Sequence, residues 1–353
     1  MQLFSRRKSS QVSVGGVLIG GNAPVSVQSM TNTDTRNIVY TVQQINALEA
    51  AGCDIVRLAV PDMEAALAIE SIKKMTKIPL VADIHYDYRL ALECLKQGVD
   101  KIRINPGNIG DSDRVSQVVN AAKERGVPIR IGVNSGSLEK EILAKHGKPT
   151  AEAMVESVMG HLKILEDRNF TDTVLSLKAS SVSVTIQAYR MLAAKCDYPL
   201  HVGVTEAGTL TTGTIKSSIG IGALLSEGIG DTIRVSLTSD PLNEVAAGIC
   251  ILQSLELREQ AVNIISCPTC GRCQIDLISI AEQVEQALKT CKKHINVAVM
   301  GCSVNGPGEA AEADIGIAGG DGVVMLFKKG KAIRKIPQES AVAELLKEIE
   351  YLN

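Results

Sequence analysis

The cysteines in the last third of the chain have a spacing that suits a metal centre. Cys267 and Cys270 form a CxxC pair, and Cys302 opens the glycine-rich stretch SVNGPGE. A CxxC pair places two thiolates on one tight turn, and nearby glycines allow backbone N–H groups to point at sulfur. The pair alone is a weak signal. The third cysteine in the same small segment makes an iron–sulfur cluster used for reductive chemistry the favoured interpretation.

The spacing leaves three interpretations open: reduced buried thiols, structural zinc with Cys273 as fourth ligand, and a [4Fe–4S] cluster held by three cysteines. In the third, one iron is free for a weaker oxygen ligand such as Glu309, seven positions after Cys302. A replaceable ligand lets substrate reach the metal, whereas a closed site only holds structure or passes electrons. The remaining cysteines are predicted to be structural: Cys53, Cys94, Cys196, Cys250 and Cys291.

A second group of chemically capable residues lies within or just after short apolar runs. Alternation along an extended strand puts Arg103 and Asn105 on one face, and likewise Asp83 and His85. Each charge taken singly is read more simply as half of a structural ion pair. Four arginines and a lysine with few acids, however, favour a bound anion, because burying unpaired positive charge is costly. Arginine forks suit phosphate oxygens, which predicts a small, highly anionic phosphate ester as ligand. The group comprises Arg57, Asp83, Arg103, Asn105, Arg130, Asn134, Lys178, Glu206 and Arg234.

Three of the polar residues have an individual interpretation. Glu206 follows the seventh predicted strand and acts either as a general acid or as the counter-charge to Lys178, with slight preference for the acid. His85 is a reserve proton donor. Lys178 ends the sixth predicted strand, where a Schiff-base lysine of an aldolase would lie, and this keeps a second enzyme class open.

The elements that must position these residues alternate between strand-like and helix-like runs. Amphipathic segments such as Val39–Gly52 and Asp113–Gly126 each end in glycine, which is a typical helix stop. Eight strand–helix units predict a closed (β/α)8 barrel, with an open doubly wound sheet as the alternative. A preceding hairpin, Gln11–Ala23, is expected to plug the bottom of the barrel. The predicted strands are Val25–Met30, Ile55–Val60, Leu80–Ile84, Lys101–Pro106, Ile129–Val133, Val174–Lys178, Leu200–Val204 and Ile233–Leu237.

After about residue 255 the pattern changes, which predicts a barrel domain over 1–255 and a small α+β cluster-binding domain over 256–353. The second domain is expected to contain a cysteine-rich turn, a helix, a strand and the glycine-rich loop in that order. Two further strands and a final helix complete it. AGGDG at Ala318–Gly322 lies between the last two strands, so a hairpin turn is favoured there over a phosphate loop.

Composition narrows the class of protein. The chain has 353 residues, a net charge of −2, 3% aromatic residues and no Trp, which disfavours nucleic-acid binding. No uninterrupted apolar run approaches the roughly 18–20 residues that cross a bilayer. The odd number of cysteines and the absence of a signal-like core predict a cytoplasmic protein that has no membrane partner.

Several long motifs resemble one known family. The strings SCPTCGRCQIDL and VMGCSVNGPGEAAEADIGIAGG, with ADIHYDYRLAL, KIRINPGNIG, IRIGVNSGSL and HVGVTEAG, look like 4-hydroxy-3-methylbut-2-enyl diphosphate synthases. The likeness runs nearly end to end and is similar to the two-domain bacterial form. It implies reductive ring opening of 2-C-methyl-D-erythritol 2,4-cyclodiphosphate in the non-mevalonate isoprenoid pathway, with flavodoxin or ferredoxin as electron donor.

The resemblance also implies roles for individual residues. It implies a [4Fe–4S] cluster on Cys267, Cys270, Cys302 and Glu309, with Glu206 as the acid near the departing hydroxyl. A homodimer is implied, in which the cluster domain of one chain closes over the barrel of the other. The implied diphosphate pocket comprises Arg57, Asp83, His85, Arg103, Asn105, Arg130, Asn134, Lys178, Arg234 and Ser236.

One residue departs from the family pattern, because members usually carry a non-cysteine residue at the position of Cys273. We expect Cys273 to be a bystander that faces away at the start of the following helix. Three hypotheses are carried forward: the reductive cluster enzyme, a barrel lyase or aldolase using Lys178 with a zinc-stabilised appendage, and a non-catalytic zinc-ribbon module fused to a barrel.

Overall fold

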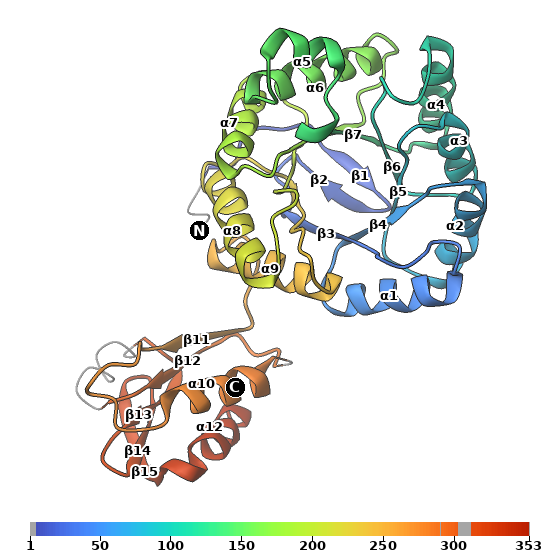
Figure 1. The fold of residues 1–353 in the computed structure, drawn as a ribbon. Helices are drawn as coiled ribbons and strands as arrows, with labels where there is room; N and C mark the ends of the chain where they lie inside the picture. The colour runs from blue at the N-terminus through green and yellow to red at the C-terminus, as the bar shows by residue number, and fades with distance from the viewer. Residues whose placement is uncertain (1–4, 290, 303–311, 353) are drawn as a thin grey trace. The chain divides into compact units, whose positions relative to one another are not determined.

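The fold is described from a computed structural model, which covers residues 5–289, 291–302 and 312–352 (Figure 1). The chain divides into two compact units, Met1–Arg258 and Glu259–Asn353. Each unit has a hydrophobic core of its own, built from its own strands and helices. No helix in the described part of the chain is long and apolar enough to span a membrane.

The first unit is a barrel of parallel strands. Its eight strands pair in the order β8-β7-β6-β5-β4-β3-β10-β9. A parallel bridge between Leu175 and Leu200 brings β8 beside β9, so the sheet closes on itself and the open doubly wound alternative is wrong. The strands are β3 (Ser26–Met30), β4 (Ile55–Ala59), β5 (Leu80–Asp83), β6 (Lys101–Ile104), β7 (Ile129–Asn134), β8 (Thr173–Lys178), β9 (His201–Val202) and β10 (Thr232–Ile233).

Helices surround the barrel, and Figure 1 shows them as an outer ring. Local signals fix many of their ends. The Asp111 side chain accepts a hydrogen bond from the Arg114 N–H at the start of α4, and Gly126 ends that helix with φ 62°. The helices are α1 (Ile38–Ala50), α2 (Met63–Met75), α3 (Tyr88–Lys96), α4 (Ser112–Arg125), α5 (Lys140–His146), α6 (Ala151–Glu166), α7 (Val182–Ala193), α8 (Leu210–Ser226) and α9 (Pro241–Ser254).

A short hairpin precedes the barrel, as the sequence indicates. β1 (Val12–Val14) and β2 (Val17–Ile19) pair antiparallel through a Gly15–Gly16 turn. Val14 and Ile19 pack against Ile55 and Val81, which lie in the first halves of β4 and β5. The hairpin therefore lies at the amino-terminal end of the barrel, and it leaves the opposite end of the strands free for a ligand.

The second unit is a five-stranded sheet in the order β11-β12-β13-β14-β15. Helices α10 (Leu277–Leu288) and α12 (Ala341–Glu350) share one hydrophobic core with it. The expected hairpin at Ala318–Gly322 is confirmed, since β13 and β14 pair antiparallel and the Gly320 N–H donates to the Val323 carbonyl. The strands are β11 (Val262–Ser266), β12 (Ile295–Met300), β13 (Ile315–Gly319), β14 (Val323–Lys328) and β15 (Lys331–Pro337).

Two of these strands are not indicated by the sequence pattern. β11 and β15 are the edges of the sheet, and each has a neighbour on one side only. β15 reads KAIRKIP and is exposed except at Ile336, so it lacks the alternation of a half-buried strand. β11 is partly buried along most of its length, and its apolar run is short. Edge strands are commonly short or charged, which weakens their signal.

Candidate active site

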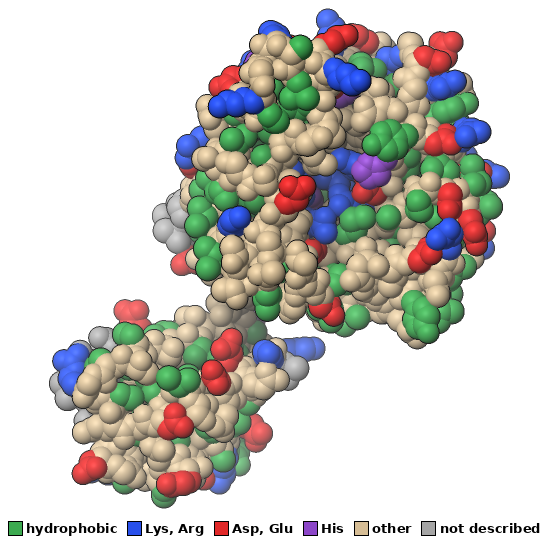
Figure 2. Space-filling view, viewed as in Figure 1, with side chains coloured by type: hydrophobic (Ala, Val, Ile, Leu, Met, Phe, Trp, Pro, Cys, Tyr) green, Lys and Arg blue, Asp and Glu red, His purple; other side chains and the backbone are tan. Residues whose placement is uncertain are grey.

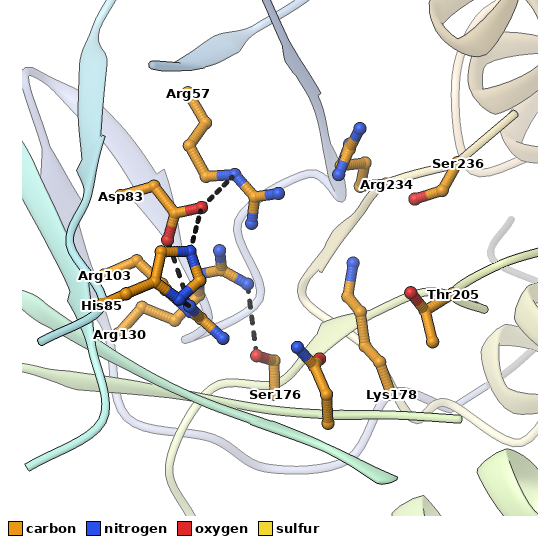
Figure 3. Close-up of a pocket in the computed structure, with 11 residues that line it drawn as sticks. Arg57, Asp83, His85, Arg103, Arg130, Ser176, Lys178, Thr205, Arg234 and Ser236 are labelled. Atoms are coloured by element: carbon orange, nitrogen blue, oxygen red, sulfur yellow. Dashed lines mark hydrogen bonds and ion pairs between the residues drawn. The ribbon is translucent and has the colours of Figure 1, made fainter. Parts of the chain in front are cut away.

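One pocket opens at the carboxyl ends of the barrel strands, where barrel enzymes place their chemistry. Its cavity volume is about 220 Å³. Figure 2 shows Lys and Arg side chains gathered in the hollow at the centre of this face, and Figure 3 shows the lining residues in detail. The lining residues are Arg57, Asp83, His85, Arg103, Arg130, Asn134, Ser176, Lys178, Thr205, Arg234 and Ser236.

Strand register explains why the cations meet. Asp83 on β5 is paired with Arg103 on β6, and Arg103 is paired with Arg130 on β7. Side chains at one level of neighbouring parallel strands point to the same face, and here that face is the interior of the barrel. The apolar residues between them, such as Ile102 and Ile131, point outward into the core beneath the helices. The sequence alternation is therefore the direct cause of the polar interior.

Two glycines make room for the long cationic side chains. The Arg103 Nη2 donates to the Gly132 carbonyl at 2.8 Å, and a Cβ atom on Gly132 would lie 2.4 Å from the Arg103 Nε. A Cβ atom on Gly203 would lie 3.0 Å from the Lys178 Nζ and 2.4 Å from the Arg234 carbonyl oxygen. Both glycines let a cation cross the barrel interior against bare backbone.

We therefore expect Gly132→Ala to displace Arg103 and to weaken anion binding. Displacing one charge-assisted contact should lower pyrophosphate affinity by about tenfold or more. Isothermal titration calorimetry with pyrophosphate measures the change. Gly160→Ala is the matched control, since nothing lies within 4 Å of the added methyl group and the position is inside α6. Equal affinities for both variants would show that the close approach at Gly132 is unimportant.

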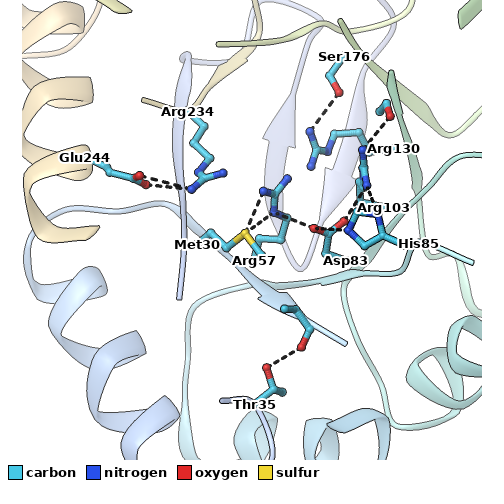
Figure 4. Close-up of polar contacts among 12 residues, drawn as sticks. Met30, Thr35, Arg57, Asp83, His85, Arg103, Arg130, Ser176, Arg234 and Glu244 are labelled. Atoms are coloured by element: carbon cyan, nitrogen blue, oxygen red, sulfur yellow. Dashed lines mark hydrogen bonds and ion pairs between the residues drawn. The ribbon is translucent and has the colours of Figure 1, made fainter. Parts of the chain in front are cut away.

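Asp83 is the acidic centre of the pocket (Figure 4). Its carboxylate lies 3.2 Å from the Arg103 Nη1, 3.7 Å from the Arg57 Nε and 3.7 Å from the His85 Nε2. Burial alone raises the pKa of Asp83, but the charge of Arg57, the nearby His85 side chain and the charge of Arg103 together hold that pKa below its usual range. Asp83 is therefore an ionised organiser of cations, not a proton donor.

The pocket lining has more cations than acids. The Nζ of Lys178 and the Nε and Nη2 of Arg130 are buried and have no hydrogen-bond partner among the described residues. Burial, followed by the neighbouring arginines, lowers the pKa of Lys178 well below its ordinary value, and burial lowers that of Arg57 to about 10. Unpartnered buried cations are unfavourable unless an anion completes the site. The geometry therefore suits a phosphorylated ligand.

Glu244 is a contributor that the sequence analysis missed. It lies on α9, is buried, and its carboxylate lies 3.2 Å from the Arg234 Nη2. It also accepts from the Ser29 hydroxyl at 3.2 Å and from the Leu237 N–H at 2.9 Å. The side chain thus fixes Arg234 from behind the pocket. Acidic residues are common in the first turn of a helix, and Glu244 comes two residues after the Pro241–Leu242 start of α9. The sequence therefore offers no reason to single it out.

The expected site residues are placed as follows. All ten predicted diphosphate-pocket residues except Asn105 line the cavity. Asn105 is buried just after β6, with its Oδ1 unpartnered among the described residues. Glu206 is exposed and follows Thr205, which does line the cavity. Ser176 and Thr205 were not predicted, although Ser176 is two residues before Lys178 and alternation could have found it. Glu309 lies outside the described residues.

The cysteine segment lies at one end of the small sheet. Cys267 directly follows β11, and Cys302 follows the neighbouring parallel strand β12 by one residue. The Gly301 N–H donates to the Cys267 Sγ at 3.2 Å, a contact typical of metal-binding thiolates. Hydrogen bonds from the backbone and side chain of Arg272 lower the pKa of the exposed Cys270 thiol. These donors fit a metal or cluster chemically.

They do not form a closed metal site on their own. Within 5–302 (apart from 290) and 312–352, no three His, Cys, Asp or Glu side chains lie close enough together to hold a metal ion. The expectation for Cys273 needs correction. Its Sγ donates to the Ile275 carbonyl at 3.2 Å and lies beside Gly301, whose added Cβ would be 2.7 Å from it. Cys273 therefore points toward the end of β12 near Cys302, and it precedes α10 by several residues.

A closed parallel barrel with a cationic mouth, followed by a separate cysteine-bearing domain, defines a class of two-domain barrel enzymes. Comparison with known families identifies the member of that class. The chain matches the GcpE TIM-barrel domain over residues 9–249 and the GcpE protein C-terminal domain over residues 263–351. The chain belongs to the GcpE family.

Curated relatives agree along almost the whole chain. A Ruminiclostridium cellulolyticum protein named 4-hydroxy-3-methylbut-2-en-1-yl diphosphate synthase (flavodoxin) is 64% identical over 346 residues, covering 98% of each chain. A Geobacter sulfurreducens protein of the same name is 59% identical over 345 residues, again covering 98% of each. The sequence-based resemblance is confirmed, and the chain is an oxidoreductase of isoprenoid biosynthesis. The lyase or aldolase alternative is not supported.

A solved structure shares the barrel alone. Dihydropteroate synthase from Stenotrophomonas maltophilia superposes with a TM-score of 0.51 at 15% identity, covering 70% of this chain and 97% of that one. At this identity the likeness shows the fold and nothing about the ligand.

Proposed function

We propose that this chain catalyses the reductive ring opening of 2-C-methyl-D-erythritol 2,4-cyclodiphosphate to 4-hydroxy-3-methylbut-2-enyl diphosphate. The reaction takes up two electrons. The C2–O bond to the diphosphate breaks, a carbon–carbon double bond forms, and the C3 hydroxyl leaves as water after taking a proton. The product keeps its diphosphate on the remaining ester bond.

One observation carries this proposal: five cations line a single pocket that contains one carboxylate, Asp83. A cyclic diphosphate supplies the negative charge that the unpartnered nitrogen atoms of Arg130 and Lys178 lack. Arg57 and Arg103 are already oriented by Asp83, so their outward N–H groups are preorganised. The same contacts hold the diphosphate after the C2–O bond breaks, which keeps the product's carbon skeleton in place.

We assign to Glu206 the role of the acid that donates a proton to the departing hydroxyl. Glu206 is exposed and follows the pocket-lining Thr205 in the loop after β9. Its φ of 52° is uncommon for a residue other than glycine, and such conformations cluster at functional sites. His85, which lies 3.7 Å from Asp83, is the second residue at the mouth able to carry a proton.

We assign the resident cofactor, a [4Fe–4S] cluster, to Cys267, Cys270, Cys302 and Glu309. Thiolates on two adjacent loops, with a backbone N–H directed at Cys267, are the donor set that such a cluster uses. When bound, a cluster of this kind supplies electrons one at a time. The donor proposed here is flavodoxin, which the relatives' names carry, with ferredoxin as the alternative.

The remaining assignments follow from this reaction. We assign substrate binding to the barrel domain, 1–255, and cluster binding to 256–353. Because both are required for one reaction, we propose a homodimer in which one chain's cluster domain serves the other chain's barrel, excluding water from reactive species. A cytoplasmic location follows from the need for a reducing environment and a soluble electron donor.

Anaerobic purification tests the cofactor assignment. We expect a brown protein with broad absorbance near 400 nm and about four irons per chain. Cys302→Ser should lose the cluster and all turnover, whereas Cys291→Ser, at a half-buried cysteine after α10, should retain both. A colourless protein with one zinc that cannot be reconstituted with iron and sulfide would contradict the proposal. Loss of the cluster in Cys273→Ser would show that the ligand set is wrong.

A further inference from the structure

A second cluster of polar side chains lies beside the barrel mouth and outside the pocket. Glu139, in the connection between β7 and α6, lies 2.5 Å from the Nε2 of His161 on α6. Ser157, one turn earlier on α6, donates its hydroxyl to the other Glu139 oxygen at 2.8 Å. The Nδ1 of His161 accepts the Gly107 N–H at 3.2 Å. We call Glu139, Ser157 and His161 the Glu139 cluster.

These contacts fix the protonation pattern of His161. The Gly107 N–H is a donor, so the Nδ1 must be the unprotonated acceptor, and the proton of the neutral ring lies on Nε2 toward Glu139. His161 is buried, and burial lowers its pKa, although Glu139 opposes that shift. Ser157 is directed at the carboxylate instead of the imidazole. Nε2 lies close to Glu139 without hydrogen-bond geometry, so the arrangement is an imidazole held against backbone at Gly107 and not a nucleophilic triad.

The contacts of His161 reach the two loops that follow pocket strands. Gly107 lies two residues after Asn105 and four after the pocket residue Arg103. Glu139 follows the pocket residue Asn134 by five residues, through the short helix η1 (Ser135–Ser137). A Cβ atom on Gly107 would lie 2.6 Å from the His161 Cε1, so the imidazole packs directly on that loop's backbone. One buried imidazole thus connects both loops to α6.

We propose that His161 is a positioning residue, whose Nδ1 clamps the β6–α4 loop at Gly107 and thereby holds the β6 side of the anion pocket in its binding geometry. This inference rests on the proposed function for its ligand class, a diphosphate. The clamp itself rests only on the contacts among the Glu139 cluster and Gly107.

The contact between His161 and Gly107 depends on pH. Protonation of His161 places an N–H at Nδ1 against the Gly107 N–H, which removes the loop contact even though the pairing with Glu139 strengthens. Glu139 from the β7–α6 connection is the charged group that acts on His161 in the described structure. Because the folded-state pKa of His161 is lowered, the clamp is complete above the ordinary histidine pKa and is lost as pH falls through the lowered value.

Two substitutions of similar size test the two contacts of the imidazole one at a time. In His161→Asn the side-chain oxygen replaces Nδ1 and still accepts from Gly107. In His161→Gln the amide nitrogen replaces Nε2 and still faces Glu139, but the acceptor for Gly107 is lost. We expect H161N to keep the native affinity for pyrophosphate at pH 7.5 and H161Q to lose about fivefold, as for one buried hydrogen bond.

The measurements use the full, anaerobically purified protein. Amide hydrogen exchange of the peptide containing Gly107 should stay slow in H161N and accelerate in H161Q. Calorimetry with pyrophosphate should show that the affinity of the native chain relative to H161N falls as the pH is lowered step by step below the ordinary histidine pKa. Equal exchange and affinity in both variants, whether native-like or impaired, would overturn the clamp. If the native chain bound no pyrophosphate, the anion pocket would fail, while exchange at Gly107 would still decide the clamp.

Discussion

Replacing Lys178 by methionine should abolish most anion binding and at the same time make the protein more stable. The Lys178 Nζ is buried and has no partner among the described residues, so it is a charge kept for a ligand. Removing one partner of a buried charge pair costs a few kcal/mol, which predicts a loss of about 100-fold in pyrophosphate affinity and in kcat/KM. Calorimetry and steady-state kinetics measure the two losses.

The same buried charge that binds the anion destabilises the protein when no anion is bound, which explains the gain in stability. In the free protein Lys178 is surrounded by Arg57, Arg130 and Arg234, and its pKa is lowered by burial and then by those charges. The unfolded chain binds the lysine proton more tightly, so Lys178 lowers the free energy of unfolding at neutral pH. A methionine of similar length should raise that free energy by about 1–4 kcal/mol. The gain should shrink as pH approaches the ordinary lysine pKa.

Lys216→Met is the matched control, because Lys216 is an exposed lysine on α8. It should change neither pyrophosphate affinity nor the free energy of unfolding by more than about 0.5 kcal/mol. If Lys178→Met bound pyrophosphate as tightly as Lys216→Met, the anionic ligand would not contact Lys178. If it unfolded more easily than the native chain, Lys178 would be a structural residue.

The sequence predicted the barrel because its physical signals are local. Alternating apolar strands and glycine-ended helices such as Asp113–Gly126 have a period that a single sequence displays directly. The same alternation placed Arg103 and Lys178 inside the barrel, where the pocket contains them. Most of the pocket residues could therefore be predicted from the cation-rich strand ends, because both the strand direction and the side-chain face follow from the sequence.

What the sequence did not predict depends on contacts between distant residues. Glu244 reaches Arg234 and Ser29 across more than one element, and nothing in its own helix distinguishes it. His161 lies far from Gly107 in sequence but accepts its N–H in space, and Glu139 lies against the other side of the imidazole. The orientation of Cys273 toward Gly301 depends on how β12 ends. Such relations require the tertiary structure, whereas the periodic signals do not.

Asp83→Asn is the substitution for which we expect the largest loss of stability. Asp83 neutralises Arg57 and Arg103 in a buried site, and asparagine keeps its shape without its charge. Removing one partner of a buried pair leaves uncompensated charge and costs about 3–5 kcal/mol in the free energy of unfolding. Urea denaturation should show this loss at neutral pH. Pyrophosphate should recover part of it, because the anion replaces the missing negative charge.

The pH dependence distinguishes this charge effect from a simple packing defect. The pKa of Asp83 is lower in the folded chain than in the unfolded chain. Its contribution is therefore complete above the ordinary aspartate pKa and is lost as pH falls through the folded-state value. The difference between the native chain and Asp83→Asn should narrow on acidification. A packing defect would give a difference that does not change with pH.

Asp87→Asn provides the control, since it makes the same chemical change four residues later. Asp87 begins α3 and pairs with the exposed Arg89, and asparagine also accepts hydrogen bonds at a helix start. Its cost should stay within about 0.5 kcal/mol. If both substitutions cost equally little, the cations of the mouth are held by other groups. If only Asp83→Asn is costly and pyrophosphate reverses it, one carboxylate holds the empty pocket together until the diphosphate binds.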